Sequence, residues 1–463
     1  MTKSRTGKAD RGDLFSRRSF LKTGGALAAG GGLLLSPIGS KAFDWEDAAP
    51  GAKKDGIQRY RKLGRTGFMV SDISLGCGSL SEPEVVRYAY DKGINYFDVA
   101  ESYGNGDSEM KIGGAMEFMN RKKIFITTKV AVEPDTDEAE ILQRFGQCLD
   151  RLKTGYADAF CLHSVANVSL IPHKAFHKAT ARLKADGKIR FVGISSHGPY
   201  REDQNSMEQV LCAAAEDGRF DLMLLAYNFL NSEEGDRVLA CCKKNDVGTT
   251  AMKSMPGYLE LDPFDPENPT GDYLEYIERM EARGVERSVS IQRIIQWLEG
   301  QAETTARIKP FAAKYGIKTN EELRAKSIQW ILSNPEMHTV TVSMPDFESI
   351  DDVLPVTGTE LAQADREFLE DYAAAFGDQY CRHACATCLS ACPHQVPVST
   401  IMRYSYYFAR QHREKLAMKK YAKLEGCDAE RCADCAAPCK NACPHGVNVP
   451  LQMMKAHSLL KLA

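Results

Sequence analysis

Eight cysteines stand in two short runs whose spacing suits inorganic clusters. Of the 15 cysteines in the chain, four lie in residues 381–393, CRHACATCLSACP, and four in residues 432–444, CADCAAPCKNACP. Four closely spaced thiolates followed by proline are typical ligands of a [4Fe–4S] cluster. The runs therefore predict two [4Fe–4S] clusters with these ligands: Cys381, Cys385, Cys388, Cys392, Cys432, Cys435, Cys439 and Cys443.

The second run repeats the first. Three of its thiols recur at an offset of 51 residues and the fourth with a slip of one, and the flanks CPHQVPV and CPHGVNV also match. This pattern indicates an internal duplication. In proteins with two such clusters, the last thiol of each run binds the other cluster. One expected ligand set is therefore Cys381, Cys385, Cys388 and Cys443, the other is Cys392, Cys432, Cys435 and Cys439, and Cys427 is spare.

Two other uses of these thiols stay open. Both runs depart by one residue from strict C-x2-C-x2-C-x3-C-P. Zinc also binds four thiolates, usually as two well-separated pairs. Disulfides are common outside the cytoplasm, although thiols two or three residues apart within one turn rarely form good bridges.

Four further titratable residues end or follow apolar runs nearer the N-terminus. Asp98 and Tyr103 lie in YFDVAESY, Lys129 ends the run in IFITTKV, and His163 ends DAFCLH. In an α/β fold, the carboxyl ends of neighbouring parallel strands meet at one edge, where catalytic groups are built. We therefore expect these four side chains to lie close together.

The elements that position them alternate between short β-rich runs and helical patterns. Such alternation predicts a parallel sheet, because parallel strands need crossover connections. Eight repeats predict an α/β fold with a closed (β/α)8 TIM barrel. Residues 255–320 form an insertion before the last strand, either a lid over the barrel or a passive loop. The expected strands are 70–77, 96–100, 124–130, 158–163, 190–196, 222–228, 248–254 and 339–344.

Residues 57–356 resemble the aldo-keto reductase family. The resemblance rests on YRKLGRTGFMVSDISLG, GINYFDVAESYGNGDSE and the strand ends TTK and LHS. It implies a catalytic tetrad of Asp98, Tyr103, Lys129 and His163. A phenol has an unperturbed pKa of about 10, and a nearby ammonium favours its ionised form. Lys129, paired with Asp98, would thus make Tyr103 a better general acid, while His163 orients the substrate oxygen.

The same resemblance implies a nicotinamide site. Tyr227 in LLAYN matches the family's stacking aromatic and is followed by Asn228; Ser195 matches a carboxamide contact, and Lys253 a phosphate contact. After the last strand, however, VSMPDFESIDD is acidic where the family often has basic residues. Carboxylates there would repel a 2′-phosphate. We expect no strong NADPH preference, and NAD(P)H binding itself stays open.

The N-terminus resembles a twin-arginine export signal. Arg17 and Arg18 precede an apolar stretch at 24–35, and Ser40-Lys41-Ala42 offers a cleavage site. An ordinary amphipathic or disordered tail with a chance Arg-Arg is the alternative. The signal implies export to the periplasm or the outer face of the cytoplasmic membrane. The expected organisation is a signal at 1–42, the barrel at 57–356, a linker at 357–380, and a small helical ferredoxin-like domain at 381–463, similar to tails on some aldo-keto reductases.

Composition narrows the function. With 59 basic and 62 acidic residues, the chain lacks the basic excess of a nucleic-acid-binding protein. We expect an exported oxidoreductase with a small carbonyl or alcohol substrate and an unknown redox partner, delivered by the twin-arginine machinery. The alternative is a non-catalytic barrel that serves as an iron–sulfur electron-transfer or scaffolding subunit.

Overall fold

A computed structural model describes residues 51–463 except 200–202, 257–263, 282–283, 300–301, 318, 384, 412, 425 and 462–463. The predicted export signal at 1–42 lies outside the described residues. From Trp45 to Ala463 the chain is one compact unit. Within the described ranges, no helix is long and apolar enough to cross a membrane.

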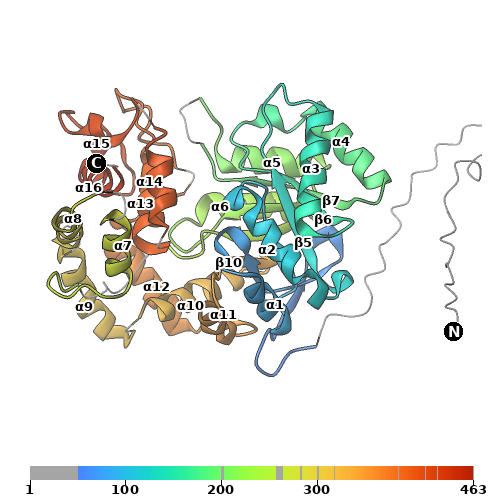
Figure 1. Cartoon of the computed structure of the whole chain (residues 1–463), viewed down its shortest axis with the longest axis horizontal. Helices are drawn as coiled ribbons and strands as arrows, with labels where there is room; N and C mark the ends of the chain where they lie inside the picture. Colours follow the sequence, from blue (N-terminus) through green and yellow to red (C-terminus); the bar gives the residue numbers. More distant parts are fainter. Residues whose placement is uncertain are drawn as a thin grey trace, which may run out of the picture. The chain divides into compact units, whose positions relative to one another are not determined.

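Eight parallel strands close into a barrel, which confirms the predicted (β/α)8 fold (Figure 1). Five of them, β3, β4, β5, β6 and β8, are buried along their whole length, as expected of strands covered on both sides. In barrel order the strands are β10 (Thr339–Ser343), β3 (Ile73–Gly76), β4 (Tyr96–Asp98), β5 (Phe125–Val130), β6 (Ala157–Leu162), β7 (Ile189–Ser196), β8 (Leu222–Ala226) and β9 (Gly248–Met252).

Helices outside the strands start at well-formed caps. Asp137 caps α3 by accepting a hydrogen bond from the Glu140 amide, and Ser206 and Gln209 form a capping box at α5. Their apolar faces pack on the strands in one core. The helices of this layer are α1 (Pro83–Asp91), α2 (Asp107–Ala115), α3 (Glu138–Leu152), α4 (Lys174–Ala185), α5 (Met207–Asp217), α6 (Glu233–Lys244), α10 (Asn320–Leu332) and α11 (Phe347–Val353).

The predicted first strand, 70–77, is divided between two elements. Its start belongs to β2 (Met69–Ser71), which pairs antiparallel with β1 (Tyr60–Lys62), and its end is β3. Asp72 separates them, because its carboxylate accepts hydrogen bonds from the Thr357 hydroxyl at 2.6 Å and the Gly358 amide at 2.8 Å. Phe68, in the β1–β2 turn, packs against Phe125 inside the amino-terminal end of the barrel.

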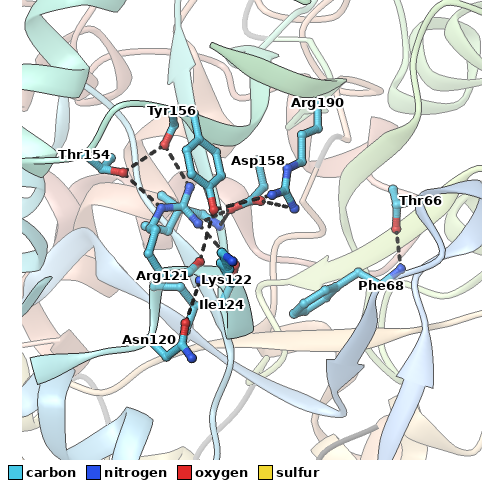
Figure 2. Close-up of polar contacts among 11 residues, drawn as sticks. Thr66, Phe68, Asn120, Arg121, Lys122, Ile124, Thr154, Tyr156, Asp158 and Arg190 are labelled. Carbon is cyan, nitrogen blue, oxygen red and sulfur yellow. Dashed lines mark hydrogen bonds and ion pairs between the residues drawn. The ribbon is translucent and has the colours of Figure 1, made fainter. Parts of the chain in front are cut away.

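A buried ion network ties strands together near their amino-terminal ends (Figure 2). Asp158 lies 2.7 Å from an Arg121 nitrogen and 3.4 Å from an Arg190 nitrogen, and it accepts a hydrogen bond from the Ile126 amide. The Tyr156 ring lies 3.8 Å and 4.8 Å from the two guanidinium carbons. Because this network lies at the end of the barrel opposite the tetrad, we assign it to stability.

The predicted insertion forms helices that pack on the cysteine-rich region. These are α7 (Gly271–Glu281), α8 (Arg287–Glu299) and α9 (Ala302–Tyr315), coloured yellow to tan in Figure 1. Tyr276 of α7 and Ile294 of α8 share an apolar core with the C-terminal helices, and the Tyr276 ring lies 5.4 Å from the Phe408 ring. The segment is therefore a packing partner of the tail and not a passive loop.

The C-terminal part of the chain is helical, as expected. The segment predicted as a linker, 357–380, contains α12 (Gln363–Phe376), whose aromatic side chains pack with Phe311 of α9. The two cysteine runs flank α13 (Val398–Gln411) and α14 (Glu414–Tyr421). The short helix α15 (Cys439–Ala442) lies within the second run, and α16 (Val449–Leu460) follows it.

Candidate functional site

Strands β4 and β5 bring Asp98 and Lys129 into contact. The buried Lys129 ammonium donates to Asp98 Oδ2 at 2.9 Å and to the Val99 carbonyl at 2.7 Å, while Thr127 donates to Asp98 Oδ1 at 2.7 Å. Burial lowers the pKa of Lys129, but Asp98 and Tyr103 outweigh this effect and the net pKa is raised. Lys129 is therefore a permanent positive charge inside the barrel.

Tyr103 and His163 complete the group. The Lys129 nitrogen lies 5.0 Å from the centre of the Tyr103 ring, and the His163 ring meets the Tyr103 ring edge-on at 5.7 Å. Burial raises the pKa of Tyr103 and Lys129 lowers it, with the net pKa raised. Burial and the nearby lysines lower the pKa of His163 to about 3, so its ring is neutral at pH 7. The structure thus brings all four predicted tetrad residues together, with a phenol, an ammonium and a neutral imidazole side by side.

Two of the predicted nicotinamide contacts have hydrogen-bond partners within the barrel. Ser195, on β7, accepts a hydrogen bond from the Ser164 amide at 2.9 Å. The Tyr227 hydroxyl donates to Asp236 at 2.6 Å and accepts from Asn334 at 3.1 Å. Asp236 belongs to α6, and Asn334 lies just after α10, so the structure places the Tyr227 ring in the helical layer and not beside the tetrad.

The other two contact the C-terminal region. Asn228 donates to the Lys253 carbonyl at 2.9 Å and to the Tyr380 hydroxyl at 3.3 Å. The Lys253 ammonium lies 5.9 Å from the centre of the Tyr407 ring of α13. Tyr406 donates to the Met255 carbonyl just beyond Lys253 at 3.3 Å. Helix α13 and Tyr380 therefore contact Lys253 and Asn228, two of the four residues expected to hold a nicotinamide.

Sequence reasoning missed the residues that α13 and its flank bring to the barrel mouth. Arg403 and Tyr407 lie on α13, Arg413 follows it, and His383 approaches His197 with ring centres 6.2 Å apart. The signal was present, because residues 403–413, RYSYYFARQHR, are dense in tyrosine and arginine. Nothing local in that stretch indicates that it packs over the strands.

The first expected set of thiols lines one cavity. Cys381, Cys385, Cys388 and Cys443 surround it, together with Arg382 and other residues. Burial and then the Cys385, Cys388 and Cys443 thiols raise the pKa of Cys381, and the pKa of Cys388 rises to about 12 through burial and neighbouring thiols. Three thiols of the first run and one of the second therefore meet.

The second set gathers in the reciprocal way. Burial, and then Cys392, Cys439 and Cys435, raise the pKa of Cys432 to about 11. The Val396 amide donates to Cys392 Sγ at 3.4 Å, and the Ala437 amide donates to Cys435 Sγ at 3.4 Å. Backbone N–H bonds to sulfur are a feature of thiolates that bind iron–sulfur clusters.

Among the described residues, no group of three or more His, Cys, Asp or Glu is close enough to hold a metal ion. Thiols that enclose a cluster of four irons and four sulfides must stand further apart than the ligands of a single ion, as in zinc sites. The described thiols therefore form no single-ion site, and the expectation of clusters rests on the number and spacing of the cysteines.

The remaining cysteines lie outside the two sets. Cys427 is exposed, and Cys77, Cys148, Cys161 and Cys242 are buried free thiols. Cys212 of α5 and Cys241 of α6 are joined in a disulfide. Their helices are neighbours around the barrel, which sequence spacing alone does not reveal.

The barrel matches a known family. A model of the Aldo/keto reductase family fits residues 81–372. The Probable aldo-keto reductase 1 of Glycine max is 31% identical over 264 residues, which cover 53% of this chain and 73% of that protein. An aldo-keto reductase of Fusarium vanettenii is 26% identical over 374 residues, 70% of this chain and 94% of that protein.

A solved structure is also similar. The holo form of an aldo-keto reductase from Bacillus halodurans superposes with a TM-score of 0.48 and 20% identity, over 68% of this chain and 95% of that chain. The family match ends before Cys381. The two cysteine runs therefore lie outside the matched residues.

Proposed function

Because the chain belongs to the aldo/keto reductase family, we propose that it is an oxidoreductase that interconverts a small carbonyl compound and an alcohol with Tyr103 as general acid. The observation that carries this proposal is the Lys129 ammonium, held by Asp98 at 2.9 Å and placed 5.0 Å from the Tyr103 ring. In reduction, an external two-electron donor supplies a hydride equivalent to the carbonyl carbon, and the Tyr103 hydroxyl gives its proton to the carbonyl oxygen as that oxygen gains negative charge. Lys129 stabilises the resulting phenolate, and the neutral His163 ring orients the oxygen.

We further propose two [4Fe–4S] clusters in the tail. The first would be held by Cys381, Cys385, Cys388 and Cys443, and the second by Cys392, Cys432, Cys435 and Cys439. Support comes from the cavity that the first set lines and from the mutual influence of the thiols in each set. A bound cluster of this kind exchanges one electron at a time.

A nicotinamide nucleotide fits this arrangement poorly. Tyr227 packs in the helical layer, Asn228 is hydrogen-bonded to the Tyr380 hydroxyl, and the Lys253 ammonium faces the Tyr407 ring. We therefore assign no step to a nicotinamide. Titration of anaerobically purified protein with NADH and NADPH, while cluster absorbance is followed, tests whether either binds.

We propose that the protein is exported by the twin-arginine route and acts in the periplasm or on the outer face of the cytoplasmic membrane. The paired Arg17 and Arg18 with the following apolar stretch support this location. The Cys212–Cys241 disulfide supports it as well, because disulfides persist mainly outside the cytoplasm.

The direct test of the catalytic proposal is Tyr103→Phe. The variant keeps the ring that packs on His163 but lacks the hydroxyl that donates the proton. Turnover of carbonyl substrates should therefore fall by roughly 10³-fold, while the free energy of unfolding stays unchanged. Anaerobic assays with an artificial reductant over a panel of aldehydes and ketones measure it. Full activity in the variant would remove Tyr103 from the reaction, and no turnover by the wild type would favour the non-catalytic alternative.

A further inference from the structure

Three cations from three segments surround one aromatic ring at the carboxyl ends of the strands. The centre of the Tyr407 ring lies 5.9 Å from the Lys253 ammonium, 5.7 Å from the Arg403 guanidinium carbon and 5.8 Å from that of Arg413. Lys253 directly follows β9, Arg403 is on α13, and Arg413 precedes α14. The barrel supplies one of these charges and the tail supplies two.

This cluster adjoins the tetrad. Arg413 donates to the Gly78 carbonyl at 3.0 Å. A side-chain carbon placed on Gly78 would lie 3.8 Å from the Tyr103 ring and 3.9 Å from an Arg413 nitrogen. The guanidinium of Arg413 and the phenol of Tyr103 therefore border the same glycine, and Tyr103 is among the groups that affect the pKa of Arg413.

In the part of the chain that the structure describes, no carboxylate forms a salt bridge with Lys253, Arg403 or Arg413. Glu414 follows Arg413 in sequence but is not among the groups that affect its pKa. Arg403 Nε is buried without a hydrogen-bond partner.

The same positive charges change the pKa of the Tyr407 phenol. Burial raises its pKa, but Lys253, Arg403, Lys420 and Arg413 outweigh burial and lower it to about 8. Lys253, Arg403 and Arg413 are half-buried, and positive charges held together with little solvent around them are unfavourable unless an anion pairs with them. A bound anion would supply this counter-charge.

We propose that Lys253, Arg403, Arg413 and the Tyr407 hydroxyl bind an anionic group of the substrate, so that the enzyme acts on small carbonyl compounds carrying a carboxylate or phosphate close to the carbonyl. This inference rests on the proposed function and adds the substrate class to it. Guanidinium groups pair with carboxylate and phosphate oxygens in two-pronged hydrogen bonds, and Lys253 adds a point charge. With the anion beside Arg413, the carbonyl would lie toward Tyr103.

Calorimetric titration of the full, iron-loaded chain tests the site without turnover. Glyceraldehyde 3-phosphate and glyoxylate are the charged probes, and glyceraldehyde and glycolaldehyde are their neutral counterparts. We expect at least one charged probe to bind on the order of tenfold more tightly than its counterpart. Which one does so distinguishes phosphate from carboxylate.

Substitutions test which residues cause the preference for charged probes. Arg403→Gln and Arg413→Gln should each abolish most of the tenfold preference, whereas Arg413→Lys keeps the charge and should retain part of it. Arg182→Gln is the matched control, because Arg182 is exposed on α4 and pairs only loosely with Asp186 at 3.9 Å. It should leave the preference unchanged.

Three results would overturn the anion site. The first is equal affinity for charged and neutral probes, and the second is an unchanged preference for charged probes in both glutamine variants. The third is NADH binding that the glutamine variants weaken, while the small probes show no preference. Failure of the proposed function looks different. Tight binding of a charged probe with no reduction of any probe would keep the site and remove the carbonyl chemistry.

Discussion

Two opposing effects act on the phenol of Tyr103. Burial raises its pKa and the Lys129 ammonium lowers it. A general acid must hold its proton at the working pH and yet release it in the reaction. The Asp98–Lys129 pair is the charged pair nearest to Tyr103 in the described site. Its loss should therefore change the pKa of Tyr103 most clearly.

We expect Lys129→Met to lower kcat for carbonyl reduction by roughly 100-fold, because the phenolate of Tyr103 loses its positive neighbour. The same change raises the pKa of Tyr103. A general acid loses activity as the pH rises through its pKa, so the descending limb of the kcat/KM profile should move to higher pH. Steady-state kinetics as a function of pH measures both effects.

Lys123→Met is the matched control. Lys123 precedes β5, the strand that carries Lys129, but its side chain is exposed. Its pH profile should match the wild type. A descending limb at the same pH in the Lys129 variant would exclude Lys129 from tuning the acid.

At the level of single residues, the sequence predicted the tetrad and not the cation cluster. Asp98, Lys129 and His163 end or follow apolar runs whose role as parallel strands is readable, so their convergence follows from strand order. Arg403 and Arg413 reach the site through packing between distant segments. Tyr227 was predicted to lie at the site, but its hydroxyl donates a hydrogen bond to Asp236 in the helical layer.

Among the secondary-structure elements, the two cysteine runs behave as one unit. Cys443 of the second run lines the cavity of the first run's thiols, and Cys392 of the first run influences Cys432 of the second. If each cluster takes ligands from both runs, two cysteines in different runs can bind the same cluster. Replacing both of them then affects only that cluster.

We therefore expect the double variant Cys381→Ser/Cys443→Ser to lose one cluster and about half of the iron and acid-labile sulfide. If each run held its own cluster, the same variant would damage both and lose nearly all of the iron. Anaerobic iron and sulfide analysis with low-temperature electron paramagnetic resonance distinguishes the outcomes. Cys427→Ser, at an exposed cysteine, should keep the full content.

The ion network beneath β5, β6 and β7 should contribute strongly to stability. Asp158→Asn leaves Arg121 and Arg190 facing each other without a counter-charge, and the free energy of unfolding should fall by roughly 3 kcal/mol. Urea unfolding measures it. Asp186→Asn breaks an exposed pair and should cost less than about 1 kcal/mol; equal losses in both variants would contradict the assigned role.

For the whole molecule, the sequence predicted a barrel followed by a helical tail but not how closely the two are joined. Strand periodicity and the cysteine duplication are local signals. The packing of α7 and α8 into the core of the tail, and of α13 over Lys253, depends on long-range contacts that no local pattern encodes. The segment expected to link them, 357–380, itself contains the packed helix α12.

Export and disulfide formation should be coupled. We expect Arg17→Lys/Arg18→Lys to keep the protein in the cytoplasm with Cys212 and Cys241 reduced, because cytoplasmic reductants maintain free thiols. Its iron content should equal that of the exported protein, since the twin-arginine route carries folded proteins. Cell fractionation with thiol-alkylation mass spectrometry measures this; export of the variant at the normal level would contradict the predicted signal.

The shared cavity also sets an order of synthesis. Cys381 cannot meet Cys443 until the ribosome has made both runs and α13 and α14 between them. A nascent chain stalled in that interval would lack one wall of this cavity. If the proposed cluster binds there, its ligand set can therefore be complete only after synthesis has passed Cys443.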